Sequence, residues 1–307
     1  MKIRKILSIM AVSAMFAGIL QGCSAKASDG GTFTILEGTF SEITILGRMA
    51  GILIEENTDL EVVYHDSMNT VAAGNAVEKK EVDLYVSYDG TLLTTLLGHD
   101  PSDVPEGEDL YVFANEAGKE ERGMMLISKF GFENTYALAV KNGFAETNKV
   151  DTISSLKPFT KDLVFGSEHE FFDEEGTMRF NPFNAHYGID WKDSASIDIG
   201  LKYSAIDNGN IDVTMVYSTD GLNKKSDLRI LSDDQKFFPQ YFGAYLSRET
   251  IFEEFKASAP NLEEILTSLE GKISTEEMID LNYAVDADGR DPKEVAKEFL
   301  VSKGLSK

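Results

Sequence analysis

Cysteine is almost absent from this chain, which contains a single one, Cys23, in 307 residues. A lone cysteine cannot form an intramolecular disulfide, so the body of the protein depends on core packing for its stability. No thiol follows residue 23, and a cysteine nucleophile in the body of the protein is therefore excluded.

Positive charge is also scarce. Lys and Arg together number 29 against 52 Asp and Glu, which gives a formal net charge of −23. Nucleic acids and anionic lipid headgroups attract positively charged protein surfaces. We therefore expect no nucleic-acid partner, and the acidic surface favours solubility.

The chain has one apolar run that resembles a targeting signal. Three basic residues stand within the first five positions, residues 6–20 are apolar or small, and Gly22 precedes Cys23. The run is too short to span a bilayer comfortably, and its order of basic, apolar and small regions is typical of an export signal. It resembles a bacterial lipoprotein signal, although Gln21 stands where such signals usually carry a small residue. This resemblance implies that Cys23 is acylated and anchors the protein at the extracytoplasmic face of the cell membrane.

Removal of residues 1–22 would take away three basic residues and no acidic one. The remaining chain would carry 26 basic and 52 acidic residues, a net charge of −26. Residues 23–31 begin with the lipidation site and continue with small, polar residues, so we expect them to form a tether.

Short β-branched or aromatic runs alternate with amphipathic stretches in the rest of the chain. We expect strands at 32–36, 60–64, 83–87, 136–140, 163–166, 196–199, 213–217, 228–231 and 243–246. We expect helices at 41–57, 70–80, 110–126, 154–161, 181–187, 202–208, 249–257, 261–269 and 274–283, and a last one capped by Asp291. The alternation predicts an α/β fold with parallel sheets covered by helices on both faces.

The same pattern predicts two lobes. Residues 32–134 and 243–307 would form lobe 1, residues 135–242 would form lobe 2, and the ligand cleft would lie between them. Ligands of open α/β sheets bind at the carboxyl ends of strands, so residues just after the strands are the first candidates for a site.

Four tyrosines occupy such positions: Tyr88, Tyr136, Tyr217 and Tyr241. Converging aromatic faces attract a quaternary ammonium ion, which cannot donate a hydrogen bond. Each tyrosine taken alone is also typical of ordinary packing, and sequence distance does not establish that the four converge.

The chain resembles the substrate-binding proteins of ABC importers for glycine betaine, carnitine and choline. The resemblance rests on Phe40-Ser41-Glu42 with Ile45-Leu46-Gly47, Tyr88-Asp89-Gly90-Thr91, residues 131–140 (GFENTYALAV), 198–203 (DIGLKY), 217–221 (YSTDG) and 233–241 (DDQKFFPQY). These stretches follow the order found in the family and extend over almost the whole mature chain.

This resemblance implies a two-lobed fold of the periplasmic-binding-protein type (type II) that closes on its ligand. The four tyrosines match the cage around a trimethylammonium group, and Thr91 matches a polar ligand contact. It further implies a monomer that passes its ligand to an ABC permease and ATPase, without a cofactor or bound metal and without enzyme activity.

Two positions depart from the family pattern. Ile43 stands where the family commonly has a glutamine that contacts the ligand, and Asp89 stands where it commonly has a threonine. Both changes disfavour a ligand carboxylate and favour a cation without one, such as choline, provided that these side chains reach the pocket.

Other constellations are weaker. The four histidines lack metal-binding spacing, and His169, within Ser167-Glu168-His169-Glu170, is more typical of a surface turn. Glu168 and Glu170 would suit acid–base chemistry, but pairs of acids are frequent by chance in so acidic a chain. Three alternatives to a quaternary ammonium receptor stay open: a binding protein for an amino acid or another organic cation, a secreted hydrolase, and an adhesin or sensor subunit.

Overall fold

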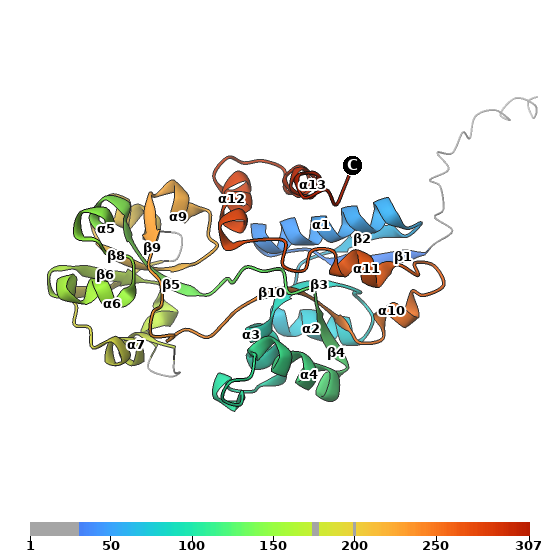
Figure 1. Cartoon of the computed structure of the whole chain (residues 1–307), viewed down its shortest axis with the longest axis horizontal. Helices are drawn as coiled ribbons and strands as arrows, with labels where there is room; N and C mark the ends of the chain where they lie inside the picture. The colour runs from blue at the N-terminus through green and yellow to red at the C-terminus, as the bar shows by residue number, and fades with distance from the viewer. Residues whose placement is uncertain (1–30, 174–177, 199–200) are drawn as a thin grey trace, which may run out of the picture.

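The structure is a computed structural model that describes residues 31–173, 178–198 and 201–307. The expected signal segment, Cys23 and nearly all of the tether lie outside the described residues. The described chain forms two bodies with separate β-sheets, connected by two extended segments (Figure 1).

Lobe 1 contains a parallel pair of strands, β1 and β2, and a three-stranded sheet of order β3-β10-β4. An isolated parallel bridge between Ile35 and Leu84 connects the two groups. The elements are β1 (Thr32–Leu36), α1 (Ser41–Asn57), β2 (Glu61–His65), α2 (Thr70–Glu78), β3 (Tyr85–Tyr88), α3 (Asp89–Thr91), η1 (Leu92–Leu97), η2 (Pro101–Asp103), α4 (Leu110–Arg122), β4 (Met124–Ile127), β10 (Gly243–Arg248), α10 (Ile251–Glu254), α11 (Leu262–Thr267), α12 (Thr275–Asp286) and α13 (Pro292–Ser302).

Lobe 2 is built on a five-stranded mixed sheet of order β7-β6-β8-β5-β9. The elements are β5 (Tyr136–Lys141), α5 (Asn142–Asn148), α6 (Ile153–Leu156), η3 (Lys157–Asp162), β6 (Val164–Ser167), η4 (His169–Phe172), α7 (Phe180–Tyr187), β7 (Asp193–Ser196), α8 (Lys202–Asp207), β8 (Val213–Tyr217), α9 (Leu222–Lys225) and β9 (Leu228–Ile230). β6 runs parallel to β7 and β8, and β5 runs antiparallel to β8 and β9.

Each lobe has its own hydrophobic core. The core of lobe 1 packs α1 against its sheet, with Phe33, Ile45 and Leu46 fully buried. The core of lobe 2 is rich in aromatic rings, among them Phe165 and Phe171, and Trp191 stacks on Phe165 with ring centroids 5.0 Å apart. Separate cores allow the lobes to move relative to each other as units.

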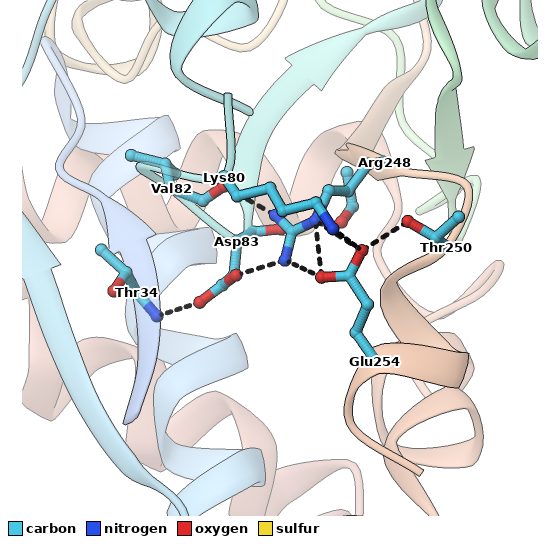
Figure 2. A network of polar contacts seen from close by, with 8 residues as sticks. Thr34, Lys80, Val82, Asp83, Arg248, Thr250 and Glu254 are labelled. Atoms are coloured by element: carbon cyan, nitrogen blue, oxygen red, sulfur yellow. Dashed lines mark hydrogen bonds and ion pairs between the residues drawn. The ribbon is translucent and has the colours of Figure 1, made fainter. Parts of the chain in front are cut away.

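An ion-pair network joins the strands of lobe 1 to its C-terminal helices (Figure 2). The guanidinium of Arg248 donates hydrogen bonds to Asp83 at 2.6 Å and to Glu254 at 2.8 Å, and Asp83 also accepts the backbone N–H of Thr34. The hydrogen bonds that Glu254 accepts, from Arg248 above all, hold its pKa at about 2, well below its ordinary value. The network fixes β10, where the chain returns to lobe 1, against β1 and α10.

The two segments between the lobes run side by side. Glu133 and Phe242 form an antiparallel bridge, and the backbone N–H of Asn134 donates to the carbonyl of Tyr241 at 2.9 Å. In Figure 1 these are the green segment before β5 and the orange segment before β10. A paired crossing of this kind is a natural hinge, because few residues must change conformation when the lobes move.

Most of the expected elements are present, with two informative errors. The helix expected at 110–126 ends at Arg122, because Gly123 adopts a left-handed conformation with φ of 59° and the chain then forms β4. The expectation of parallel sheets holds for β1–β2, β6–β7 and β6–β8. It is wrong for β10, which runs antiparallel to β3 and β4, and for β5, which runs antiparallel to β8 and β9. Both strands lie where the chain enters a lobe from the crossing segments.

Candidate functional site

The tyrosines of lobe 2 form a stacked pair at the end of its sheet. Tyr136 is the first residue of β5, Tyr217 is the last residue of β8, and the antiparallel register places them opposite each other. Their ring centroids are 5.2 Å apart and the planes differ by 24°. Burial raises the pKa of Tyr136, and the neighbouring Tyr217 and Glu168 raise it further.

The tyrosines of lobe 1 form a second stacked pair. Tyr88 ends β3, Tyr241 lies two residues before β10, and their ring centroids are 5.1 Å apart. The hydroxyl groups of Tyr241 and Thr91 share a hydrogen bond of 2.5 Å. Gly90 makes this arrangement possible, because a Cβ atom at that position would lie 2.3 Å from the ring of Tyr241.

The tyrosine pair of one lobe influences the pKa of the pair in the other lobe. Burial raises the pKa of Tyr241 to about 12, and Tyr217 from the other lobe is among the groups that add to this shift. The crossing segments connect the pairs directly, since Tyr136 and Tyr241 stand at the ends of the two segments that bridge the lobes. The structure thus places the four tyrosines in two stacked pairs, and their role as a ligand cage stays a prediction.

A cleft of about 410 Å³ opens beside the pair of lobe 2. It lies at the carboxyl ends of β6, β7 and β8, where ligands of open α/β sheets bind. The residues that line it are Tyr136, Glu168, His169, Ser196, Ile197, Asp198 and Tyr217. A larger groove of about 880 Å³ runs between α1 and α13, but its lining is mostly charged surface residues and includes no aromatic ring.

A buried carboxylate, Glu42, holds the lobe-1 side of the site together. It accepts hydrogen bonds from the hydroxyl of Tyr88 at 2.5 Å and from the side-chain amides of Asn134 and Asn282 at 3.0 Å each. Asn282 also donates to the backbone carbonyl of Thr219, two residues after Tyr217. Burial raises the pKa of Glu42, and the hydrogen bonds that it accepts oppose this shift.

These contacts make Glu42 a junction between four parts of the fold. They join α1, the end of β3, the first crossing segment and α12, and α12 in turn contacts the loop of lobe 2 that follows β8. That contact is close, because a Cβ atom on Gly221 would lie 2.4 Å from the backbone nitrogen of Tyr283.

A second buried acid, Glu168, lies in the wall of the lobe-2 cleft. The residue is 2% exposed, and its Oε2 atom is 3.7 Å from the ammonium of Lys202, which is 1% exposed. The same ammonium lies 5.1 Å from the ring centroid of Tyr217. Burial lowers the pKa of Lys202, and Glu168 and Asp220 oppose this effect.

Comparison with known proteins identifies the family of this chain. Residues 31–302 match the family described as the substrate-binding domain of the ABC-type glycine betaine transport system. The chain belongs to this family. Its members bind a solute for transport, so this substrate-binding protein is not an enzyme, and its partners are the permease and ATPase subunits of an ABC importer.

Two named relatives match this chain over most of its own length. The chain is 31% identical to the carnitine transport binding protein OpuCC of Listeria monocytogenes, over 97% of this chain and 96% of the relative. It is 30% identical to the ergothioneine transport permease/ergothioneine binding protein EgtU of Helicobacter pylori, over 86% of this chain and 46% of that longer protein.

Solved structures confirm the fold. A crystal structure described as a glycine betaine/carnitine/choline ABC transporter is 29% identical and superposes with a TM-score of 0.82, over 89% of this chain and 98% of that one. The fold class expected from the sequence, a two-lobed α/β substrate-binding protein, is therefore correct.

The two candidate specificity residues lie beside the site rather than in the lining of the lobe-2 cleft. Ile43 is 3% exposed and packs in the core of lobe 1. Asp89 is fully buried, and its Oδ1 atom accepts the backbone N–H groups of Gly90 at 2.7 Å and Phe242 at 2.9 Å. Their influence on ligand choice stays a prediction.

Several polar residues of the substrate-binding protein's site were not recognised from the sequence as parts of it: Glu42, Asn134, Lys202 and Asn282. Glu168 was considered and set aside as one member of a chance pair of acids. One signal was available for Glu42, an acid that begins a helix whose following turns are almost entirely apolar. The described part of the chain contains no cluster of three or more His, Cys, Asp or Glu residues arranged to hold a metal ion.

Proposed function

We propose that this substrate-binding protein captures a quaternary ammonium compound, such as choline, glycine betaine or carnitine, and delivers it to its permease for osmoprotectant uptake. The observation that carries the proposal is the pair of tyrosine stacks, Tyr88 with Tyr241 and Tyr136 with Tyr217, at the two ends of the interlobe crossing. Aromatic faces contribute up to about 2 kcal/mol per well-placed ring to the binding of a desolvated cation. The relatives described as binding carnitine and glycine betaine support the same ligand class.

The two stacks belong to different lobes, so a ligand held by both would favour the closed arrangement. We propose the lobe limits inferred from the sequence, 32–134 with 243–307 for lobe 1 and 135–242 for lobe 2. Sheet membership supports these limits, because β5 to β9 form the sheet of lobe 2 and β10 pairs with β3 and β4 in lobe 1. Thr91 would serve as a polar contact through its hydroxyl, which shares a hydrogen bond with the hydroxyl of Tyr241.

Isothermal titration calorimetry of the full-length protein in a non-ionic detergent tests this proposal. The ligands are choline, glycine betaine and carnitine, and glycine is the matched control because it keeps a carboxylate but lacks the methyl groups. Saturable binding of at least one trimethylammonium compound, with no heat from glycine, is expected. Binding of glycine alone, or of none of the four, would overturn the assignment of the ligand class.

Ergothioneine should be titrated in the same experiment. Ergothioneine also carries a trimethylammonium group, and one relative is described as binding it. Tighter binding of ergothioneine than of the three smaller compounds would keep the tyrosine cage and change the substrate. An amino acid or another organic cation is the remaining alternative, and competition with betaine distinguishes it.

We also propose that Cys23 carries lipid chains that hold a monomer at the outer face of the membrane. The export signal before Cys23 supports this proposal. Within residues 31–173, 178–198 and 201–307, no helix combines the length and the apolar character needed to cross a bilayer. Metabolic labelling with a radioactive fatty acid should label the wild-type protein and fail to label Cys23→Ser.

A further inference from the structure

The wall of the lobe-2 cleft contains a carboxylate oxygen that finds no partner in the described residues. Glu168 is 2% exposed and lines the cleft beside Tyr136 and Tyr217. Its Oε2 atom lies 3.2 Å from the hydroxyl of Ser167 and 3.7 Å from Lys202, whereas its Oε1 atom has no hydrogen-bond partner among these residues. A buried acceptor without a partner loses the free energy that water would have supplied.

The charges around this oxygen determine what it can accept. Lys202 lies behind Glu168, outside the lining of the cleft, and compensates the carboxylate from the core side. The described lining contains a second carboxylate, Asp198, and includes neither lysine nor arginine. A ligand carboxylate would therefore meet like charge at this wall, whereas a hydroxyl or N–H would meet an acceptor.

Glu168 lies in the same wall as the stacked rings of lobe 2. It lines the same cleft as Tyr136 and Tyr217, so its carboxylate lies beside these rings. A cation held against Tyr136 and Tyr217 would place the substituent on its nitrogen near Glu168. The carboxylate would then attract the cation and also accept a hydrogen bond from the substituent.

We propose that Glu168 makes this protein selective for quaternary ammonium compounds that carry a hydrogen-bond donor, with choline as the model ligand, over those that end in a carboxylate. The inference rests on the proposed function, since it assumes that the tyrosine pairs hold an ammonium group. Glu168 acts in it as a ligand contact, and Lys202 acts as the positioning residue that pairs with its carboxylate in the wall.

Three ligands separate the contributions of the aromatic rings, a ligand hydroxyl and a ligand carboxylate to binding. Tetramethylammonium reports on the rings alone, choline adds a hydroxyl, and glycine betaine adds a carboxylate. Calorimetry of the full-length protein should give a dissociation constant for choline below those of the other two. In Glu168→Gln the advantage of choline over glycine betaine should fall roughly tenfold or more, because a hydrogen bond to a charged acceptor and a like-charge repulsion are both lost.

Two further variants keep the test decisive. Glu168→Gln leaves the ammonium of Lys202 buried without its counter-charge, which can prevent folding. The double variant Glu168→Gln with Lys202→Met removes both charges together, and the same loss of selectivity is expected from it. Asp190→Asn is the matched control, because it removes one carboxylate from an 80% exposed side chain of the same lobe and should leave the ratio unchanged.

The outcomes separate this inference from the function on which it rests. If the wild-type protein binds none of the three ligands, both proposals fail. If it binds glycine betaine as tightly as choline, or if a folded Glu168 variant keeps the wild-type ratio, only the role of Glu168 is overturned. A collapse of the ratio in either Glu168 variant, with Asp190→Asn unchanged, supports the inference.

Discussion

Tyr136 and Tyr217 face each other across β5 and β8 at the last rung of the sheet, with ring centroids 5.2 Å apart. Their register fixes this contact, because residues directly opposite in an antiparallel pair point to the same face of the sheet. The backbone of lobe 2 therefore positions the two rings in the absence of a ligand. Such preorganisation lowers the cost of ordering side chains on binding.

Replacement of Tyr217 by alanine should weaken the binding of a quaternary ammonium ligand at least tenfold. The loss corresponds to about 1.4 kcal/mol, within the range of one desolvated cation–π contact. Tyr217 ends its strand, so we expect the fold to survive, with an unchanged circular dichroism spectrum. Calorimetric titration with the best ligand measures the effect.

Tyr217→Phe is the matched control for this change. It keeps the ring and its stacking on Tyr136 but removes the hydroxyl, and binding should stay within a few-fold of wild type. An unchanged dissociation constant in Tyr217→Ala would contradict the role of this ring in the cage.

Replacement of Glu42 by glutamine should weaken both stability and ligand binding. Tyr88, Asn134 and Asn282 all donate to Glu42, and the amide nitrogen of a glutamine cannot accept any of these bonds. A buried donor left unsatisfied costs about 1–3 kcal/mol, which urea denaturation would detect. Affinity should fall as well, because Tyr88 loses the acceptor that holds its hydroxyl.

The comparison for Glu42 comes from the same helix. Glu55 is exposed on α1, and Glu55→Gln should leave stability within about 0.5 kcal/mol of wild type. If Glu42→Gln proved as stable as Glu55→Gln, the junction of α1, β3 and α12 would not depend on the carboxylate.

The tyrosines could be predicted from the sequence because local patterns place them. Tyr88 and Tyr217 directly end strands that are visible as β-branched runs, and the carboxyl ends of such strands are where ligands gather. Tyr136 and Tyr241 flank the segments that connect the lobes. Strand limits thus identified these four positions as candidates, but they did not establish that the rings converge or which rings stack.

The polar support of the site could not be predicted in this way. Glu42, Asn134 and Asn282 are 92 to 240 residues apart from one another along the chain, and no local pattern joins them. Glu168 occupies a short acidic stretch that is typical of a solvated turn, yet the fold buries it against Lys202. Burial of a charged side chain depends on tertiary packing, which periodicity does not report.

Replacement of Gly90 by alanine should disturb the lobe-1 pair. The new Cβ atom would lie 2.3 Å from the ring of Tyr241, so the ring must move away from Tyr88 and Thr91. We expect roughly a tenfold loss of ligand affinity, because a displaced ring no longer faces the cation. Gly47→Ala is the matched control, since its Cβ would meet only Ile35 at an ordinary 3.6 Å and helix propensity favours alanine. Equal affinity in the two variants would show that the position of Tyr241 is unimportant for binding.

The stability of the protein should depend on pH through Asp89. Burial raises the pKa of this carboxyl group to about 7, although hydrogen bonds from the backbone of Gly90 and Phe242 and the charge of Lys129 oppose the shift. Its ordinary pKa is about 3.8. A carboxyl group whose pKa is higher in the folded state binds its proton more tightly there, so its contribution to folding is full below pH 3.8 and is lost as pH rises through 7.

Asp89→Asn removes this dependence while it keeps an oxygen for the two backbone N–H groups. The variant should gain stability over wild type as pH rises from 5 to 9, by up to about 3 kcal/mol, because asparagine pays no cost of ionisation in the core. Urea denaturation of both proteins at several pH values measures the difference, and Asp190→Asn shows how much an exposed carboxylate contributes. A difference between Asp89→Asn and wild type that stays constant from pH 5 to 9 would mean that Asp89 is ionised throughout this range. In that case the charge next to Tyr241 would be permanent, and its attraction for a cationic ligand would not vary with pH.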